Sequence, residues 1–148
     1  MENLLVSACL LGFKCKYSGG SNALPEETIE KLRARYRLIP VCPETAGGLP
    51  IPRDLSERLG ERVVSRRGAD VTRQYKKGAE IALALARRYG CSKALMKERS
   101  PSCGSGLIYD GSFSGKLVEG DGCAAELLKA AGVSVTGENV TELLIMPD

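Results

Sequence analysis

The chain has 148 residues, a formal net charge of +3 and no histidine. This length predicts one domain with a buried core over residues 1–148, and the small charge gives no support for bulk nucleic-acid binding. No apolar run approaches the roughly 20 residues of a membrane span. The N-terminus, MENLLVSACLLG, lacks the basic region of a secretory signal. We therefore predict a cytoplasmic protein that does not cross a membrane.

The counts of histidine and cysteine restrict the possible chemistry further. Without histidine, Ser-His-Asp and Cys-His catalysis and all imidazole metal sites are excluded. Six cysteines are many for a chain without a secretion signal. In a reducing compartment they indicate metal ligands or redox groups rather than disulfides. The alternative for several of them is burial as small hydrophobic side chains.

The sequence alternates short apolar runs with helical patterns. The first half of the chain predicts a strand at Leu4–Ser7, a helix from Pro25 with Ile29, Leu32 and Tyr36 on its buried face, and a strand at Leu38–Val41 that Pro40 places near a sheet edge. An ordered loop over 42–60 and a hairpin over 61–71 turning at Gly68 follow, and then a helix from Asp70 or Thr72 to Tyr89. The remaining predicted elements are a strand at Lys93–Met96, a hairpin around Asp110 and Gly111, a helix over 123–131, a strand over 133–135 and a helical turn over 140–144. This order predicts an α/β fold, a single-domain, Rossmann-like three-layer sandwich around a mostly parallel sheet of about four strands with a small hairpin.

Three cysteines follow three different predicted strands. Cys9 comes two residues after the first strand, Cys42 directly after the second, and Cys103 in the loop after the third. In an open α/β sheet, reacting groups gather outside the carboxyl ends of the strands, so these thiols could converge on one metal centre. Soft thiolates select zinc, copper(I) or iron–sulfur clusters. Their spacing does not separate these metals, and three unrelated loop thiols are the alternative.

At these positions the sequence resembles the thiouracil desulfidase family. The matching motifs, which span nearly the whole chain, are SACLLG over 7–12 followed by CKY over 15–17, PVCPE over 40–44 with GGL over 47–49 and PR over 52–53, SPSCG over 100–104 and, more weakly, EGDG over 119–122. The family usually has Tyr-Asp-Gly where this chain has Tyr17, Ser18 and Gly19. A role assigned to that aspartate therefore cannot be transferred to this chain.

The resemblance implies a [4Fe-4S] cluster held by Cys9, Cys42 and Cys103, with a fourth iron that no protein side chain binds. This iron would take the sulfur of a thiolated uracil, and water would replace the sulfur without net redox. Family members with an added domain act on thiolated tRNA, whereas this sequence predicts a single domain. The expected partner is therefore a small thiolated pyrimidine base or nucleotide, with nucleic acid unlikely. A monomer and a homodimer both remain open.

The mechanism needs a base for the attacking water, and without histidine a carboxylate is the candidate. Glu44, two residues after Cys42, is predicted to be this general base, and Ser102 to contact the substrate or the water. Ser100 is a further candidate contact. A Gly/Ser loop that includes Ser21 and Asn22 could bind an anion through backbone N–H groups, with Arg53 and Lys97 as cationic partners. Cys15 is assigned to the surroundings of the metal centre, and Cys91 and Cys123 to packing.

Two other functions fit the same residues. A zinc hydrolase would use the same three thiolates. A carrier of sulfur or of a cluster, with Cys15 as sulfur acceptor, would bind and transfer without turnover. A reader of thiolated RNA is a weaker alternative, and it predicts steep salt dependence of binding.

Overall fold

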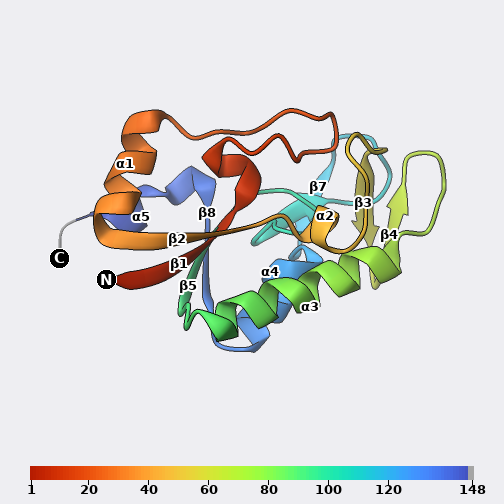
Figure 1. Ribbon diagram of the computed structural model, residues 1–148. Helices are drawn as coiled ribbons and strands as arrows, with labels where there is room; N and C mark the ends of the chain where they lie inside the picture. Colours follow the sequence, from red (N-terminus) through yellow and green to blue (C-terminus); the bar gives the residue numbers. More distant parts are fainter. Residues whose placement is uncertain (147–148) are drawn as a thin grey trace.

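The computed structural model describes residues 1–146. Its centre is a four-stranded parallel sheet in the order β2-β1-β5-β8 (Figure 1). The strands are β1 (Glu2–Ser7), β2 (Tyr36–Val41), β5 (Lys93–Met96) and β8 (Ser134–Gly137). The predicted parallel α/β sheet of about four strands is confirmed. Pro40 lies on the edge strand β2, as its missing N–H requires.

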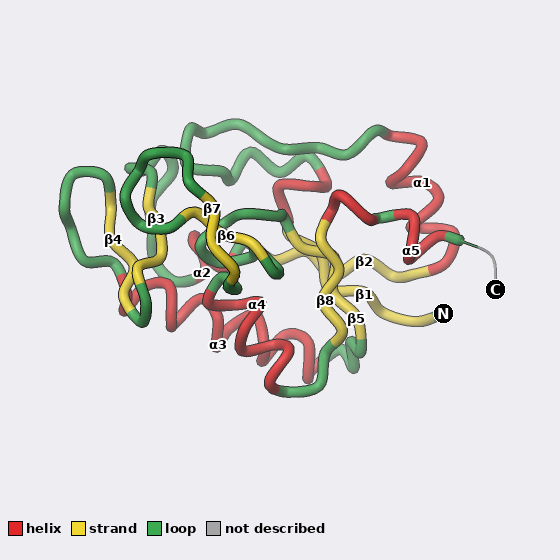
Figure 2. Tube along the Cα trace, turned by 180° about the vertical axis from the view of Figure 1, so that it is seen from behind, coloured by secondary structure: helices red, strands yellow, loops and turns green. Residues whose placement is uncertain are grey.

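Helices cover both faces of the sheet, which makes the fold a three-layer sandwich (Figures 1 and 2). One face carries α1 (Glu26–Arg35) and α5 (Glu142–Ile145), and the other carries α3 (Thr72–Arg88) and α4 (Cys123–Ala130). Side chains alternate along a strand. Leu4 and Val6 of β1 therefore pack in the hydrophobic cluster that includes Leu32 of α1, and Leu5 packs in the cluster that includes Leu83 of α3. Each face of the sheet thus has its own apolar core.

Short elements join this framework. They are two 3-10 helices, η1 (Ala8–Leu11) and η2 (Glu138–Val140), and a single turn of helix, α2 (Pro43–Ala46). The backbones of α2 and α3 lie in direct contact at Gly78. A Cβ at this position would lie only 1.8 Å from the carbonyl oxygen of Pro43. A glycine in the middle of α3 costs helix stability, but here it lets α2 reach the core layer.

Two antiparallel hairpins lie side by side at the end of the molecule where the sheet strands finish (Figures 1 and 2). The first pairs β3 (Ser56–Leu59) with β4 (Arg62–Ser65), and the second pairs β6 (Leu107–Tyr109) with β7 (Leu117–Glu119). The predicted hairpin around Asp110 and Gly111 is confirmed. The chain after β4 does turn back at Gly68, as predicted: Val64 forms an antiparallel bridge with Asp70, and the N–H of Ser65 donates to the Ala69 carbonyl oxygen at 2.8 Å. The hairpin of β3 and β4, which turns at Gly60, was not predicted, because β3 lies in the stretch expected to be loop.

Two further sequence predictions need correction. Tyr36 is not on the helix but begins β2, where its hydroxyl donates to the carbonyl oxygen of Leu144 at 2.9 Å. Tyr89 is not on the buried face of α3 but is 43% exposed, just past the end of the helix. Within residues 1–146, no helix is long and apolar enough to cross a membrane.

Candidate metal centre and active site

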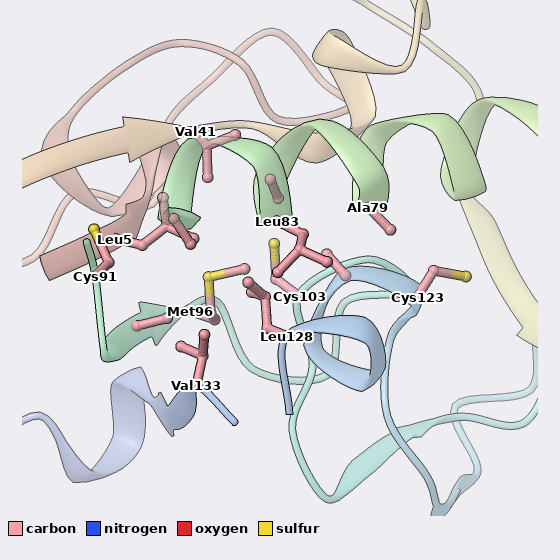
Figure 3. Packing of buried hydrophobic residues seen from close by; sticks show 14 of the residues in the cluster. Leu5, Val41, Ala79, Leu83, Cys91, Met96, Cys103, Cys123, Leu128 and Val133 are labelled. Carbon is pink, nitrogen blue, oxygen red and sulfur yellow. The ribbon is translucent and has the colours of Figure 1, made fainter. Parts of the chain in front are cut away.

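A cavity of about 510 Å³ lies at the carboxyl ends of the sheet strands and is lined by four cysteines, Cys9, Cys15, Cys42 and Cys103. Cys9 lies in η1, directly after β1, and Cys42 lies between β2 and α2. Cys103 follows β5 and also packs in the hydrophobic cluster that includes Leu83 of α3 and Leu128 of α4 (Figure 3). The topology therefore brings the three predicted cysteines, and Cys15 with them, to one place.

Backbone hydrogen bonds keep these loops in position. The N–H of Asn22 donates to the carbonyl oxygen of Cys9 at 3.0 Å, which folds the loop after η1 back over the cavity. On the other side, the first turn of α4 donates from Cys123 to Pro101 and from Ala124 to Ser102, at 2.9 and 2.8 Å. These N–H groups would otherwise have no partner at a helix start. They fix the turn that carries Cys103.

Burial disfavours the thiolate form of the cavity cysteines. Burial raises the pKa of the Cys9 thiol, against the effect of a hydrogen bond with Asn22. Burial raises the pKa of Cys103 to about 12, against hydrogen bonds with Ser102 and Ser7, and raises that of Cys15 to about 12 with the help of the neighbouring Cys42. Because thiolate is the form that ligates metals, metal binding at these sulfurs would release their protons.

The thiols are soft donors of the kind that iron–sulfur centres use. Among the residues that the structure describes, no three cysteine, aspartate or glutamate side chains lie close enough together to bind one ion. In an iron–sulfur cubane each cysteine ligates a different iron, so its thiolates lie farther apart than the ligands of one ion. Three soft donors around a cavity of this size therefore fit a cluster.

Glu44 lies beside the cysteines and has a defined partner on each carboxylate oxygen. Its Oε1 accepts from Nε of Arg53 at 3.0 Å, and its Oε2 accepts from Oγ of Ser102 at 2.9 Å and from Oγ of Ser100 at 3.4 Å. The Glu44 and Arg53 side chains are only 14% and 6% exposed. The carboxylate is thus held in one orientation at the cavity wall.

Ser102 connects this carboxylate to the cysteines. Its Oγ lies 3.5 Å from Sγ of Cys103 and donates a hydrogen bond to Oε2 of Glu44. Ser100 has a structural task as well, because its Oγ accepts from the backbone N–H groups of Ser102 and Cys103, both at 3.1 Å. One short loop therefore places a thiol and a hydroxyl beside the same carboxylate.

Comparison with known proteins identifies the family of this chain. The family model for 2-thiouracil desulfurase matches residues 4–140. The chain belongs to the 2-thiouracil desulfurase family. A curated relative from Bacillus subtilis (strain 168), uncharacterized protein YbbK, is 42% identical over 146 residues, covering 92% of this chain and 95% of the relative. A solved structure described as the [4Fe-4S]-dependent thiouracil desulfidase TudS matches with a TM-score of 0.93 and 45% identity, over 97% of this chain and 95% of that one. The family resemblance and the fold predicted from sequence are confirmed.

The anion-binding residues expected in this member of the 2-thiouracil desulfurase family differ in their surroundings. Asn22 and Lys97 line the cavity, and Ser21 is not among the lining residues. Lys97 forms an ion pair with Glu138. Besides Glu44, the Arg53 guanidinium donates to the carbonyl oxygens of Pro50 and Cys15. Arg53 thus faces protein groups on three sides, which favours a role in holding Glu44 over anion binding.

Sequence reasoning missed several residues of the site. Tyr75 of α3 is 2% exposed and its hydroxyl lies beside Glu44 and Ser56. Burial, together with the Glu44 carboxylate, raises the pKa of Tyr75 far above its usual value, so the phenol stays a hydrogen-bond donor. Glu57 and Phe113, one from each hairpin, also line the cavity. Tyr75 follows a helical apolar pattern, so nothing in the sequence separates it from ordinary core residues.

Proposed function

We propose that this chain is a [4Fe-4S]-dependent desulfidase that removes sulfur from a thiolated uracil or thiouridine nucleotide. The main support for this proposal is that three cysteines at strand ends and the hydrogen-bonded pair of Glu44 and Ser102 line the same cavity. The 45% identical structure that is described as a [4Fe-4S]-dependent thiouracil desulfidase supports it. A planar pyrimidine fits the size range of this cavity.

Cys9, Cys42 and Cys103 would hold the cluster. When bound, it would supply an open, sulfur-seeking Lewis-acid position that withdraws electrons from the ring carbon of the substrate. The carbonyl oxygen of Cys9 accepts from Asn22, that of Cys42 accepts from Ala46 of α2, and the turn that carries Cys103 is bonded to the first turn of α4. Cys15 borders the site through its carbonyl oxygen, which lies 3.8 Å from Sγ of Cys42 and accepts from Arg53.

Glu44 would take a proton from the attacking water. Arg53 and Ser102 hold its two oxygens, so the carboxylate is oriented before the substrate arrives. The water oxygen forms the new bond to carbon, the carbon–sulfur bond breaks, and the sulfur leaves with the protons of the water as hydrogen sulfide. Carbon keeps its oxidation state, so the exchange of C=S for C=O needs no oxidant or reductant.

Anaerobic reconstitution tests the cluster. Wild-type protein should take up iron and acid-labile sulfide, whereas Cys9→Ala, Cys42→Ala and Cys103→Ala should not hold an intact cluster. Cys123→Ala is the matched control, because this buried cysteine is not among the residues that line the cavity. Wild-type protein without iron, or three variants with full clusters, would overturn the proposal. Zinc as the native metal would favour the hydrolase alternative.

Turnover separates an enzyme from a carrier. Sulfide release is measured from 2-thiouracil and from a panel of thiolated uracils and their monophosphates, which also ranks base against nucleotide. Glu44→Gln keeps the size of the side chain but removes the base, and we expect it to retain the cluster and lose at least about 100-fold in kcat. A carrier would show no turnover and no response to this substitution.

A further inference from the structure

The loop between β6 and β7 extends to the cavity and is held against the neighbouring hairpin. Tyr109, Phe113 and Gly115 from this segment line the cavity. Strands β3 and β6 are in contact, and the two hairpins lie side by side in both views (Figures 1 and 2). The loop therefore forms part of the cavity wall opposite the sheet.

A buried carboxylate from β3 holds this loop. Glu57 is 5% exposed, and its Oε1 accepts from the backbone N–H groups of Gly111 at 3.0 Å and Phe113 at 3.1 Å. Gly111 has φ +96°, and a Cβ there would lie 2.9 Å from Cβ of Leu59. The glycine lets the loop approach β3 closely enough for the carboxylate to reach both N–H groups.

Phe113 has an uncommon backbone conformation. Its φ is +58°, in the left-handed region that a bulky side chain rarely adopts. The guanidinium carbon of Arg66 lies 5.9 Å from the centroid of the Phe113 ring. A strained residue persists only where its surroundings impose the conformation, and such residues cluster at ligand sites. Here Glu57 accepts from the N–H of the residue in this conformation, and the residue lines the cavity.

We propose that Phe113 is a specificity-determining residue on which the pyrimidine ring of the substrate stacks, and that Glu57 is the residue that positions it. The inference rests on the proposed function, which supplies the planar heterocycle. Phe113 has no polar group, so it would contact a pyrimidine through its ring, which Arg66 also contacts. The other aromatic lining residues, Tyr17, Tyr75 and Tyr109, each carry a hydroxyl, and Tyr75 is buried beside Glu44. Phe113 would therefore select for an aromatic ring, whereas the cysteines and Glu44 would act on the sulfur and the water.

Kinetics of cluster-loaded Phe113→Ala and Phe113→Tyr test the stacking. Stacking of a base on an aromatic side chain predicts a KM for 2-thiouracil about 5- to 150-fold higher in the alanine variant, with kcat little changed. Phe113→Tyr keeps a ring and should stay close to wild type. Phe13→Ala is the matched control, since Phe13 is 53% exposed and is not among the lining residues.

Uracil, the product, provides a readout without turnover. Calorimetric titration of uracil into the cluster-loaded proteins should show the same weakening for Phe113→Ala as the KM does. A KM and a uracil affinity within about twofold of wild type in Phe113→Ala, at wild-type iron content, would overturn the inference while leaving the proposed function intact. Wild-type protein that releases no sulfide would overturn the proposed function, and the inference with it.

Glu57 needs its own comparison. Glu57→Gln retains an oxygen that can accept both N–H groups and should keep the wild-type KM, whereas Glu57→Ala should raise KM as Phe113→Ala does. A purely structural role would lower the melting temperature of Glu57→Ala without this rise in KM. That outcome would remove Glu57 from the proposal.

Discussion

Replacing Arg53 by Met should destabilise the protein strongly, because it removes the charged partner of a buried carboxylate. Three contacts of the guanidinium are lost: to Glu44 at 3.0 Å, to Pro50 at 3.2 Å and to Cys15 at 2.9 Å. Removing one partner of a buried ion pair costs about 3–5 kcal/mol. Glu44 keeps its bond to Ser102, so we expect the lower end, about 3 kcal/mol. For a chain of this length, this corresponds to a melting temperature about 6–12 °C lower.

Thermal unfolding followed by circular dichroism measures this loss independently of activity. Lys31→Met is the matched control, because the Lys31–Glu27 pair on α1 is 59% and 80% exposed and should be worth at most about 0.5 kcal/mol. The double variant Arg53→Met/Glu44→Gln removes both charges. It should be more stable than the sum of the single effects predicts, by about 1 kcal/mol or more.

An Arg53→Met melting temperature equal to that of the Lys31→Met control would refute this reasoning. So would strict additivity in the double variant, because it would show that the two charges do not interact in the folded protein. The magnitude depends on burial: the same Glu–Arg geometry at the surface would be worth less than about 1 kcal/mol.

Three further variants test the surroundings of the site. Gly78→Ala would place a Cβ 1.8 Å from the Pro43 carbonyl oxygen, so we expect a loss of about 3 kcal/mol in urea unfolding; an unchanged midpoint would contradict the close packing of α2 on α3. Tyr75→Phe removes the hydroxyl beside Glu44 and should lower kcat at constant iron content, whereas an unchanged kcat would show that this hydroxyl does not assist the carboxylate. Cys91→Ala, in the core, should keep full iron content; loss of iron would argue against a three-cysteine set.

The positions of the cysteines could be predicted because parallel topology determines where strand ends meet. Cys9 and Cys42 follow adjacent strands, β1 and β2, and Cys103 follows β5 on the other side of β1. Strand recognition needed only short apolar runs, which are local features of the sequence. The bonds that orient the loops after those strands join distant segments, such as Asn22 to Cys9. Hydrophobic periodicity carries no information about them.

Strand β3 was missed because its buried residues are polar. Ser56, Glu57 and Arg58 are 7%, 5% and 9% exposed, so the strand has none of the apolar alternation that marks a half-buried strand. Arg58 is buried because its Nη1 donates to the carbonyl oxygen of Asp121 at 2.8 Å and lies 3.0 Å from Oε2 of Glu126. These partners follow β3 by more than sixty residues, and only the assembled fold brings them together.

Arg53 was expected to bind an anion because its partners in the folded protein, like those of Arg58, cannot be identified from the sequence. In a Pro/Gly-rich stretch read as a loop, an arginine is expected to face solvent, where its charge is available to a ligand. The structure instead buries the guanidinium against Glu44 and two carbonyl oxygens, and buries Glu57 against two backbone N–H groups. In both cases a charged side chain with low exposure orients another group at the cavity. Sequence reasoning identifies the groups that would perform the chemistry by their type, whereas the groups that orient them become visible only through their burial and their partners.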